Sequence, residues 1–315
     1  MISKIKRKIA GKVSNILRSA VRRELDDALP VISQLVAFQN SAKEDRQSFY
    51  DHTKDPLGHI GFYEGLKNRL LSAGVRVEPV DIDIPDFERW LTDFPDIKRF
   101  YENMGDVFIE KCLEHYLAFR HLKISASDTY IDVASAGSPW ARTLNAQTGV
   151  QTYRLDLSYP KGINGTDIGA DAGDTGLPGG FASVLSLQCA FECFMGDADV
   201  AFLKEAGRIL NDQGRYGIVP LYLEDQYFVC TSPYCNQAEV IIEPGARKVW
   251  RDDEYKAPFS RHYSPESFAE RIYSRIPGNM SYKVLHFENL DEVIRHYPGQ
   301  RVYCFFMFVC EKISQ

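Results

Sequence analysis

The sequence has no long apolar run, no excess of basic residues and few cysteines for its length. Its longest apolar run covers residues 302–310 and is too short to span a bilayer. The formal net charge of −6 argues against a protein that binds nucleic acid by general charge attraction. With these two classes of protein disfavoured, we expect an ordinary globular protein, because 315 residues suffice for one large domain or two small ones.

The seven cysteines form no pattern typical of disulfides or of a metal site. They are too few for a disulfide framework and no signal peptide precedes them, so we expect a reducing, cytoplasmic location. Two close pairs, Cys189 with Cys193 and Cys230 with Cys235, could bind zinc together with His262. Neither pair has the two-residue spacing of zinc knuckles. We therefore predict buried thiols and no metal.

The first 23 residues are basic, with eight Lys or Arg before the first acid, Glu24. Apolar residues recur there at steps of three and four and would line one side of a helix: Ile2, Ile5, Ile9, Val13, Ile16 and Ala20. Such a helix can lie on an anionic membrane surface, and an organellar transit peptide has a similar pattern. It can equally pack on a partner subunit or on the rest of the chain. These alternatives stay open, and self-association through the N-terminal helices is among them.

The pattern divides the chain into three parts. Residues 1–50 form a helical extension and residues 51–104 a cap of short helices and turns. Strands and helices then alternate over residues 105–315, which indicates a parallel sheet covered on both faces. Residues 224–260 do not fit the alternation and are predicted to form an inserted lid. Further expected elements are a helix over 24–50 that is interrupted at Pro30, a strand over 75–84 and a helix over 106–121.

The stretch around which the chain is organised is residues 129–138. An apolar strand contains Asp132, small residues follow, and Ser138 with Pro139 can cap and begin a helix. A strand, a tight turn and a helix N-terminus let a cofactor approach the backbone closely. Ala134, Ala136 and Ser138 stand where a nucleotide-binding loop usually has glycine.

Two further acids follow Asp132 along the chain. Asp156 ends the predicted strand 150–157 and follows Asp132 by 24 residues, close to the spacing that places an acid on a ribose in a dinucleotide fold. A polar loop over residues 159–166 replaces the helix expected next. Asp171 then precedes an apolar strand over residues 181–187.

Taken together, residues 129–223 resemble a class I S-adenosylmethionine-dependent methyltransferase. The resemblance is carried by residues 131–137, 153–158, 169–172 with 177–178, and 205–215, while 261–268 and 302–312 resemble the start of the family's last helix and its final strand. It implies an α/β fold with a doubly wound, mostly parallel sheet whose last strand is antiparallel. It also implies S-adenosylmethionine as cofactor, with Asp156 on the ribose hydroxyls and Asp171 at the adenine amino group. The residues expected to hold this cofactor are Asp132, Ala134, Ser135, Gly137, Asp156, Leu157, Asp171, Ala172 and Gln188.

Methyl transfer to a hydroxyl group needs an acceptor for the proton of that group. Glu192 and His262 are the titratable candidates near the carboxyl edge of the sheet. We expect His262 to be the base, because its ordinary pKa lies near neutrality, and Glu192 to orient the substrate. Each has a structural alternative: Glu192 can interact with a helix dipole, and His262 can be a surface or interhelical residue.

Aromatic and basic residues crowd the predicted lid: Tyr222, Tyr227, Phe228, Tyr234, Trp250, Tyr255 and Phe259, with Arg247, Lys248, Arg251 and Lys256. This composition suits a sugar ring, so the expected acceptor is a hydroxyl on a glycan or lipid-linked saccharide at a membrane surface. The alternatives are a lid that only packs on the N-terminal helices, a methyltransferase for small molecules or lipids, and a non-catalytic scaffold that assembles through residues 1–45. A nicotinamide-dependent enzyme is disfavoured, because Asp171 and Ala172 have no role in it.

Overall fold

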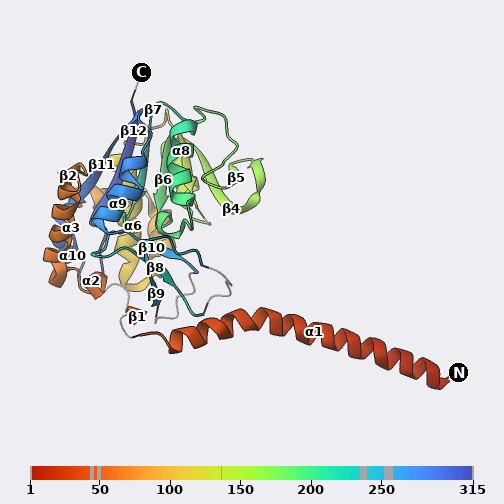
Figure 1. The fold of residues 1–315 in the computed structure, drawn as a ribbon. Helices are drawn as coiled ribbons and strands as arrows, with labels where there is room; N and C mark the ends of the chain where they lie inside the picture. Colours follow the sequence, from red (N-terminus) through yellow and green to blue (C-terminus); the bar gives the residue numbers. More distant parts are fainter. Residues whose placement is uncertain are drawn as a thin grey trace. The chain divides into compact units, whose positions relative to one another are not determined.

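Figure 1 shows a computed structural model of the chain, which describes residues 2–42, 46–47, 51–135, 137–234, 240–251 and 258–313. The chain divides into two compact units. The smaller comprises residues 1–49 and 228–260, and the larger comprises residues 50–227 and 261–315. The division predicted from the sequence, at residues 50 and 105 with an insertion at 224–260, stays a prediction.

The larger unit is built on one twisted sheet. Over the described residues it has eight strands in the order β2-β11-β12-β7-β6-β3-β4-β5. Strand β12 runs antiparallel to both of its neighbours, while the pairs β7–β6, β6–β3 and β3–β4 are parallel. The predicted mostly parallel sheet with an antiparallel last strand is therefore confirmed. The strands are β2 (Val77–Val80), β3 (Thr129–Val133), β4 (Gln151–Asn164), β5 (Asp167–Gly169), β6 (Ala182–Gln188), β7 (Leu210–Val219), β11 (Met280–Phe287) and β12 (Phe306–Lys312).

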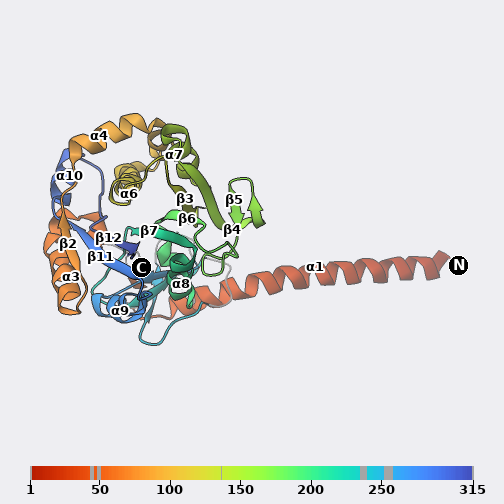
Figure 2. The ribbon, with the colours of Figure 1, turned by 90° about the horizontal axis from the view of Figure 1, so that it is seen from above.

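Helices cover both faces of this sheet, as Figure 2 shows. One face carries α4 (Ile84–Asp93), α5 (Pro95–Tyr101), α6 (Phe108–His121), α7 (Trp140–Thr148) and α10 (Leu290–His296). The other carries α3 (Ile60–Ser72), α8 (Ala198–Ile209) and α9 (Pro265–Arg271). The short helix α2 (Asp51–Lys54) also belongs to this unit. The strand β10 (Ser260–His262) crosses the division between the two units and belongs to a second, four-stranded sheet. The buried apolar strands between the two helix layers form the core.

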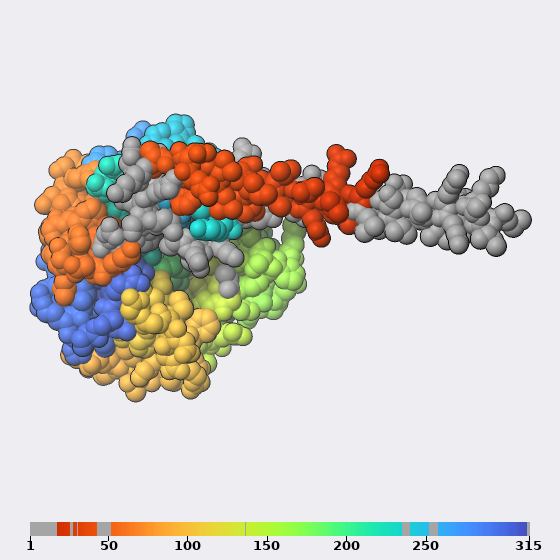
Figure 3. Space-filling view, turned by 90° about the horizontal axis from the view of Figure 1, so that it is seen from below, coloured from red at the N-terminus to blue at the C-terminus, as the bar shows by residue number. Residues whose placement is uncertain are grey.

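The helical segment before the sheet packs against the C-terminal segment (Figure 3, orange and yellow beside blue). Arg301 Nε donates to Asp106 Oδ2 at 2.6 Å, and His296 Nε2 lies 2.8 Å from Glu88 Oε1. Helix α6 lies in this layer and buries Ile109, Cys112, Leu113, Tyr116 and Leu117, as its apolar periodicity predicted. The early helices are thus part of the same core as the sheet.

Three local expectations need correction. Helix α1 (Ile2–Gln39) continues through Pro30, because the φ angle that proline imposes is itself helical. The stretch 159–166 is strand rather than loop up to Asn164, since β4 turns back and pairs with β5 through residues 161–164. The expected strand over 75–84 is shortened to β2, because Asp83 caps α4 by accepting the N–H of Asp86.

The smaller unit joins α1 to a short sheet. Strand β9 (Arg247–Arg251) pairs in parallel with β8 (Phe228–Thr231) and with β1 (Arg46–Gln47). The rings of Phe38 and Trp250 lie 6.2 Å apart, and Lys248 Nζ lies 4.0 Å from the Trp250 ring centre. None of the helices that the structure describes is long and apolar enough to cross a membrane.

Candidate active site

The site begins at the turn after β3, where a left-handed backbone conformation occurs at an alanine as well as at a glycine. Ala134 has φ +56° and Gly137 has φ +88°, both in the left-handed region. Alanine adopts this conformation at a steric cost that glycine avoids. Helix α7 starts at Trp140, one residue later than predicted, with Pro139 as N-cap. Ser138 still assists the helix start, because its Oγ accepts the N–H of Trp140 at 3.1 Å.

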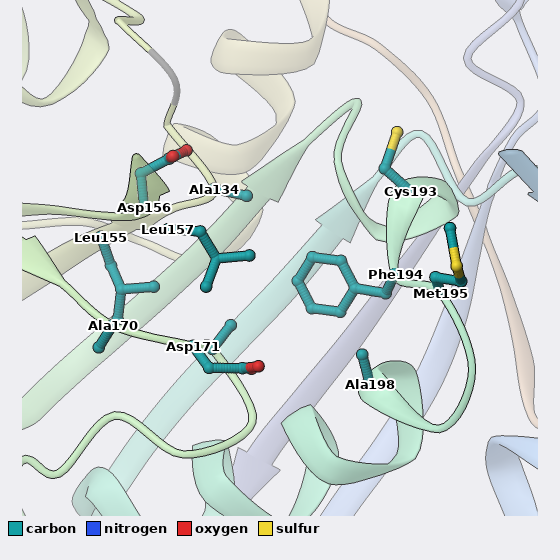
Figure 4. A pocket seen from close by; sticks show the side chains of 11 residues that line it. Ala134, Leu155, Asp156, Leu157, Ala170, Asp171, Cys193, Phe194, Met195 and Ala198 are labelled. Carbon is teal, nitrogen blue, oxygen red and sulfur yellow. The ribbon is translucent and has the colours of Figure 1, made fainter. Parts of the chain in front are cut away.

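A cavity of about 310 Å³ lies at the carboxyl ends of β3, β4 and β5, the edge at which open α/β sheets bind ligands (Figure 4). Five of the nine predicted cofactor residues line it: Ala134, Asp156, Leu157, Asp171 and Ala172. The other lining residues are Leu155, Ala170, Cys193, Phe194, Met195 and Ala198. Asp132, Ser135, Gly137 and Gln188 do not line it. Four separate segments of the chain therefore form one cavity, and the predicted residues come from three of them.

The two carboxylates in this cavity are held by their own loops. Asp156 Oδ1 accepts the N–H of Ser158 at 2.8 Å and its hydroxyl at 2.7 Å. Asp171 Oδ1 accepts the N–H of Gly173 at 2.7 Å. Because these bonds fix the side chains before any ligand arrives, both carboxylates are preorganised as hydrogen-bond acceptors.

Two apolar side chains face each other across the same cavity. Figure 4 shows Leu157 and Phe194 pointing toward one another from β4 and from the segment after β6. Leu157 is 76% exposed, which is unusual for a leucine in a concave site. A leucine and a phenyl ring on opposite walls suit a flat, ring-bearing ligand between them. Sequence reasoning missed Phe194, which follows no motif.

Asp132 lies beneath this turn rather than in the cavity. Its side chain is buried, and Oδ2 has no hydrogen-bond partner among the described residues. Burial raises the pKa of Asp132 to about 8, against the opposing effects of Arg154 and Ser138. The carboxyl group is therefore largely protonated at neutral pH unless a cation approaches it.

A second polar group, which we call the Lys111 cluster, comprises Lys111 and Glu114 on α6, Cys189 after β6 and Tyr222 after β7. Lys111 Nζ lies 2.8 Å from Glu114 Oε1 and 2.7 Å from Cys189 Sγ. Cys189 Sγ in turn lies 3.1 Å from Glu114 Oε1 and 3.3 Å from Tyr222 Oη. Sequence reasoning missed this cluster, and the only signal for it was the pair of charged residues at positions i and i+3 on the side of α6 that the sheet covers.

Glu192 lies in a single 3₁₀ turn, Phe191–Cys193, just after Cys189. Its Oε2 is buried and has no hydrogen-bond partner in the described part of the chain. Burial raises its pKa to about 7, while a hydrogen bond from its own backbone N–H and the nearby Lys111 ammonium limit the increase. Helix α8 begins only at Ala198, so Glu192 does not occupy the first turn of that helix.

His262 lies on β10 with no exposed surface. Its Nδ1 is 4.0 Å from Glu224 Oε1, and its ring centre is 5.9 Å from that of Tyr222. The same Glu224 Oε1 lies 2.9 Å from His52 Nε2, and His52 Nδ1 lies 2.8 Å from the Tyr63 hydroxyl. His262 thus adjoins a buried polar network.

The described cysteines form no disulfide, and no group of three potential metal ligands occurs among the described side chains. Cys112, Cys230, Cys304 and Cys310 are buried, while Cys193 is exposed. Cys235, one member of the predicted close pairs, lies outside the described residues.

The fold is of the type that class I methyltransferases have, with the cavity where the strand order reverses beside β3. No family model and no curated protein matches the sequence.

Solved structures similar to this chain include a Burkholderia thailandensis 1,6-didemethyltoxoflavin-N1-methyltransferase with bound S-adenosylhomocysteine, at 12% identity over 72% of this chain and 87% of that one, with a TM-score of 0.41. They also include an S-adenosylmethionine-dependent methyltransferase from Mesorhizobium loti, at 15% identity over 63% of this chain and 98% of that one, with a TM-score of 0.41. A third is a putative methyltransferase in complex with the Haloferax volcanii Trm112 activator, at 14% identity over 71% and 97%, with a TM-score of 0.40. At these identities and TM-scores, the matches carry no inference about the chemistry of this chain.

Proposed function

We propose that the chain is an S-adenosylmethionine-dependent methyltransferase. The observation that carries the proposal is the cavity at the carboxyl edge of the sheet, where Ala134, Asp156 and Asp171 arrive from three separate segments. Their order along the chain matches the family's motifs, and chance placement does not explain why all three line one cavity. The bound cofactor would supply the sulfonium methyl group.

Each wall of the cavity suits one part of that cofactor. Asp156 can accept hydrogen bonds from two ribose hydroxyls, and Asp171 can accept one from the adenine amino group. Leu157 and Phe194 can enclose the adenine ring between apolar surfaces. The turn at Ala134 and Gly137 brings backbone close to the amino-acid end, with Asp132 beneath it. Ser135 and Gln188 remain proposed contacts of the cofactor.

Glu192 is the better supported proton acceptor of the two predicted candidates. It has a buried oxygen without a partner and a pKa near neutrality, which are the properties of a general base. The complete burial of His262 beside Glu224 favours a supporting role for that side chain. This reverses the roles expected from ordinary pKa values alone.

The class of methyl acceptor is also part of the proposal, and it rests on the amino-acid composition of the predicted lid. Trp250 and Lys248 of the predicted lid adjoin one another in the smaller unit, but Trp250 is buried, so this pair is a packing contact and the support for a sugar comes from the composition of residues 224–260 alone. A glycan or lipid-linked saccharide is the preferred acceptor, and another small molecule or lipid the alternative. Peripheral contact with an anionic membrane through residues 1–23, at the inner face of that membrane in the cytoplasm, belongs to the same proposal.

Calorimetric titration of the full chain with S-adenosylhomocysteine tests the proposal. We expect measurable binding that weakens by about 2–4 kcal/mol in Asp156→Ala, because two charge-assisted hydrogen bonds are lost. Asp212→Ala is the matched control, since Asp212 is exposed on β7 and does not line the cavity. Wild-type protein that binds no S-adenosylhomocysteine, or equal affinity in Asp156→Ala, contradicts the proposal.

The alternative from a different functional class is a non-catalytic scaffold protein that retains the fold. It is favoured by a row of apolar side chains on α1 that are 51–54% exposed, as in a helix that assembles with a partner: Val21, Leu25, Leu29, Ile32 and Val36. A chain that self-associates through α1 and binds no cofactor would be this scaffold.

A further inference from the structure

The Lys111 cluster places an amine and a thiol in unusually close contact. Lys111 Nζ and Cys189 Sγ are 2.7 Å apart, a distance at the short end of the range for N–H···O bonds. Sulfur is a larger atom than oxygen, so an ordinary N–H···S hydrogen bond would be longer. The separation is closer to that of two atoms joined through one bridging atom.

A carboxylate and a phenol surround this pair. Glu114 Oε1 lies 2.8 Å from Lys111 Nζ and 3.1 Å from Cys189 Sγ, so one oxygen contacts both groups. Tyr222 Oη lies 3.3 Å from the same sulfur. Cys189 is only half-buried, and a small oxidant can therefore reach it. These contacts make the pair more than a lone cysteine.

We propose that Lys111 and Cys189 form a reversible covalent N–O–S cross-link when dioxygen or hydrogen peroxide acts on them. With dioxygen, the amine loses one hydrogen and the thiol loses its hydrogen, while N–O and O–S bonds form. The second oxygen atom leaves as water with these two hydrogens. Nitrogen and sulfur together give up four electrons, which reduce dioxygen fully. With hydrogen peroxide, two molecules accept these four electrons, one oxygen atom becomes the bridge and three molecules of water leave. Reduction by two molecules of a dithiol, which together supply four electrons and four hydrogens, restores the amine and the thiol and releases the bridging oxygen as water.

Glu114 has a defined part in this chemistry. The reacting nitrogen must be a neutral amine and the reacting sulfur a thiolate, so a proton must leave each group. Burial raises the pKa of the Cys189 thiol, which makes a neighbouring proton acceptor necessary. Glu114 Oε1 is within hydrogen-bonding distance of both atoms and can take these protons in turn.

The cross-link would join α6 to the end of β6 across 78 positions of sequence. It would also remove the Lys111 ammonium, whose charge lowers the pKa of Glu192. The cross-link would therefore change both the charge and the mobility of the carboxyl edge of the sheet. The proposal rests on the cluster's own contacts and does not depend on methyl transfer.

Mass spectrometry of the full-length wild-type protein tests it directly. One sample is reduced and a second is treated with hydrogen peroxide, and both are digested with a protease that does not cut at lysine. We expect the oxidised sample to contain a joined pair of peptides carrying Lys111 and Cys189. Its mass should equal the sum of the two peptides plus one oxygen atom minus two hydrogens, and dithiothreitol should separate the pair.

Two variants test which side chains the cross-link joins. Lys111→Arg keeps a positive charge and Cys189→Ser keeps a small polar group, and each should abolish the joined peptides. Cys193→Ser, at an exposed position four residues away, should leave them unchanged. The wild-type result decides the question whether or not a variant folds. Oxidation that yields only sulfinic or sulfonic acid at Cys189, or a disulfide with Cys193, would overturn the proposal.

Discussion

At the scale of single residues, burial rather than residue type decides which side chain can accept a proton. Histidine titrates near neutrality in water, and glutamate does so only when it is desolvated. Glu192 reaches a pKa of about 7 because it is buried next to the sheet edge, with only partial compensation from Lys111. Burial thus brings the pKa of Glu192, which is ordinarily too low for a base at neutral pH, close to neutrality.

The pH dependence of turnover follows from this value. A base must be ionised, so kcat of the wild-type enzyme should rise with pH through about 7 and level off above it. Glu192→Gln should lower kcat by about 10²–10⁴-fold and remove this rise, because the amide cannot accept the proton. Its affinity for S-adenosylhomocysteine should remain near that of the wild type.

His262→Gln is the informative comparison. If that variant loses the rise near pH 7 while Glu192→Gln retains it, the roles of the two residues are the reverse of those proposed. Methyl transfer from radiolabelled cofactor to an acceptor fraction, measured across pH 5.5–9 (a range of roughly three units around the pKa), gives both profiles.

At the scale of elements, the turned-back end of β4 shapes the cavity. Residues 161–164 pair with β5 in place of a helix, and this holds Asp156 and Ala170 on adjacent walls. The close approach needs a glycine: a Cβ at Gly169 would lie 2.1 Å from the carbonyl oxygen of Pro160 and 2.4 Å from that of Tyr159. Both neighbours are backbone atoms, which cannot move without breaking the pairing.

Gly169→Ala should therefore destabilise the protein by about 1–3 kcal/mol and weaken binding of S-adenosylhomocysteine. Gly65→Ala is the matched control, because Gly65 lies exposed inside α3 with no atom within 4 Å of an added Cβ. That change should stabilise the protein by about 0.5–1 kcal/mol. Chemical unfolding and calorimetry measure both effects. A Gly169→Ala protein with wild-type stability and affinity would mean that the turned-back strand does not shape the site.

At the scale of the whole molecule, charge and apolar surface are concentrated on one helix. Helix α1 carries the basic N-terminal residues and, further along, the exposed apolar row from Val21 to Val36. The side chains of residues 2–17, which supply most of the predicted basic stripe, lie outside the described ones. Arg18, Arg22 and Arg23 are described and exposed.

We expect the full chain to bind liposomes that contain anionic lipid, and salt to weaken the binding. Each basic residue near such a surface contributes about 1 kcal/mol at most, so replacing Arg18, Arg22 and Arg23 with Gln should weaken binding by up to about 100-fold. The same replacement at exposed Arg76, Arg99 and Arg295 serves as control. Co-sedimentation that shows equal binding for both triple variants, or none for the wild type, would leave α1 as a packing or assembly surface.

The sequence alone determined the order of elements and the identity of the two cavity carboxylates. Strand and helix periodicities are local properties, and an acid at the end of a parallel strand lies at the same sheet edge as its neighbours whatever the details of packing. The resemblance predicted a mostly parallel sheet with an antiparallel last strand, and the structure confirms both.

Only the tertiary structure decided which side chains meet and which are desolvated. Lys111 and Cys189 are 78 positions apart, and Phe194 faces Leu157 only because β6 and β4 flank β3 in one sheet. The burial that raises the pKa of Glu192 and encloses His262 comes from elements packed around them, which no local spacing encodes. Contacts and desolvation depend on the folded arrangement of distant segments, so these parts of the site could not be read from the sequence.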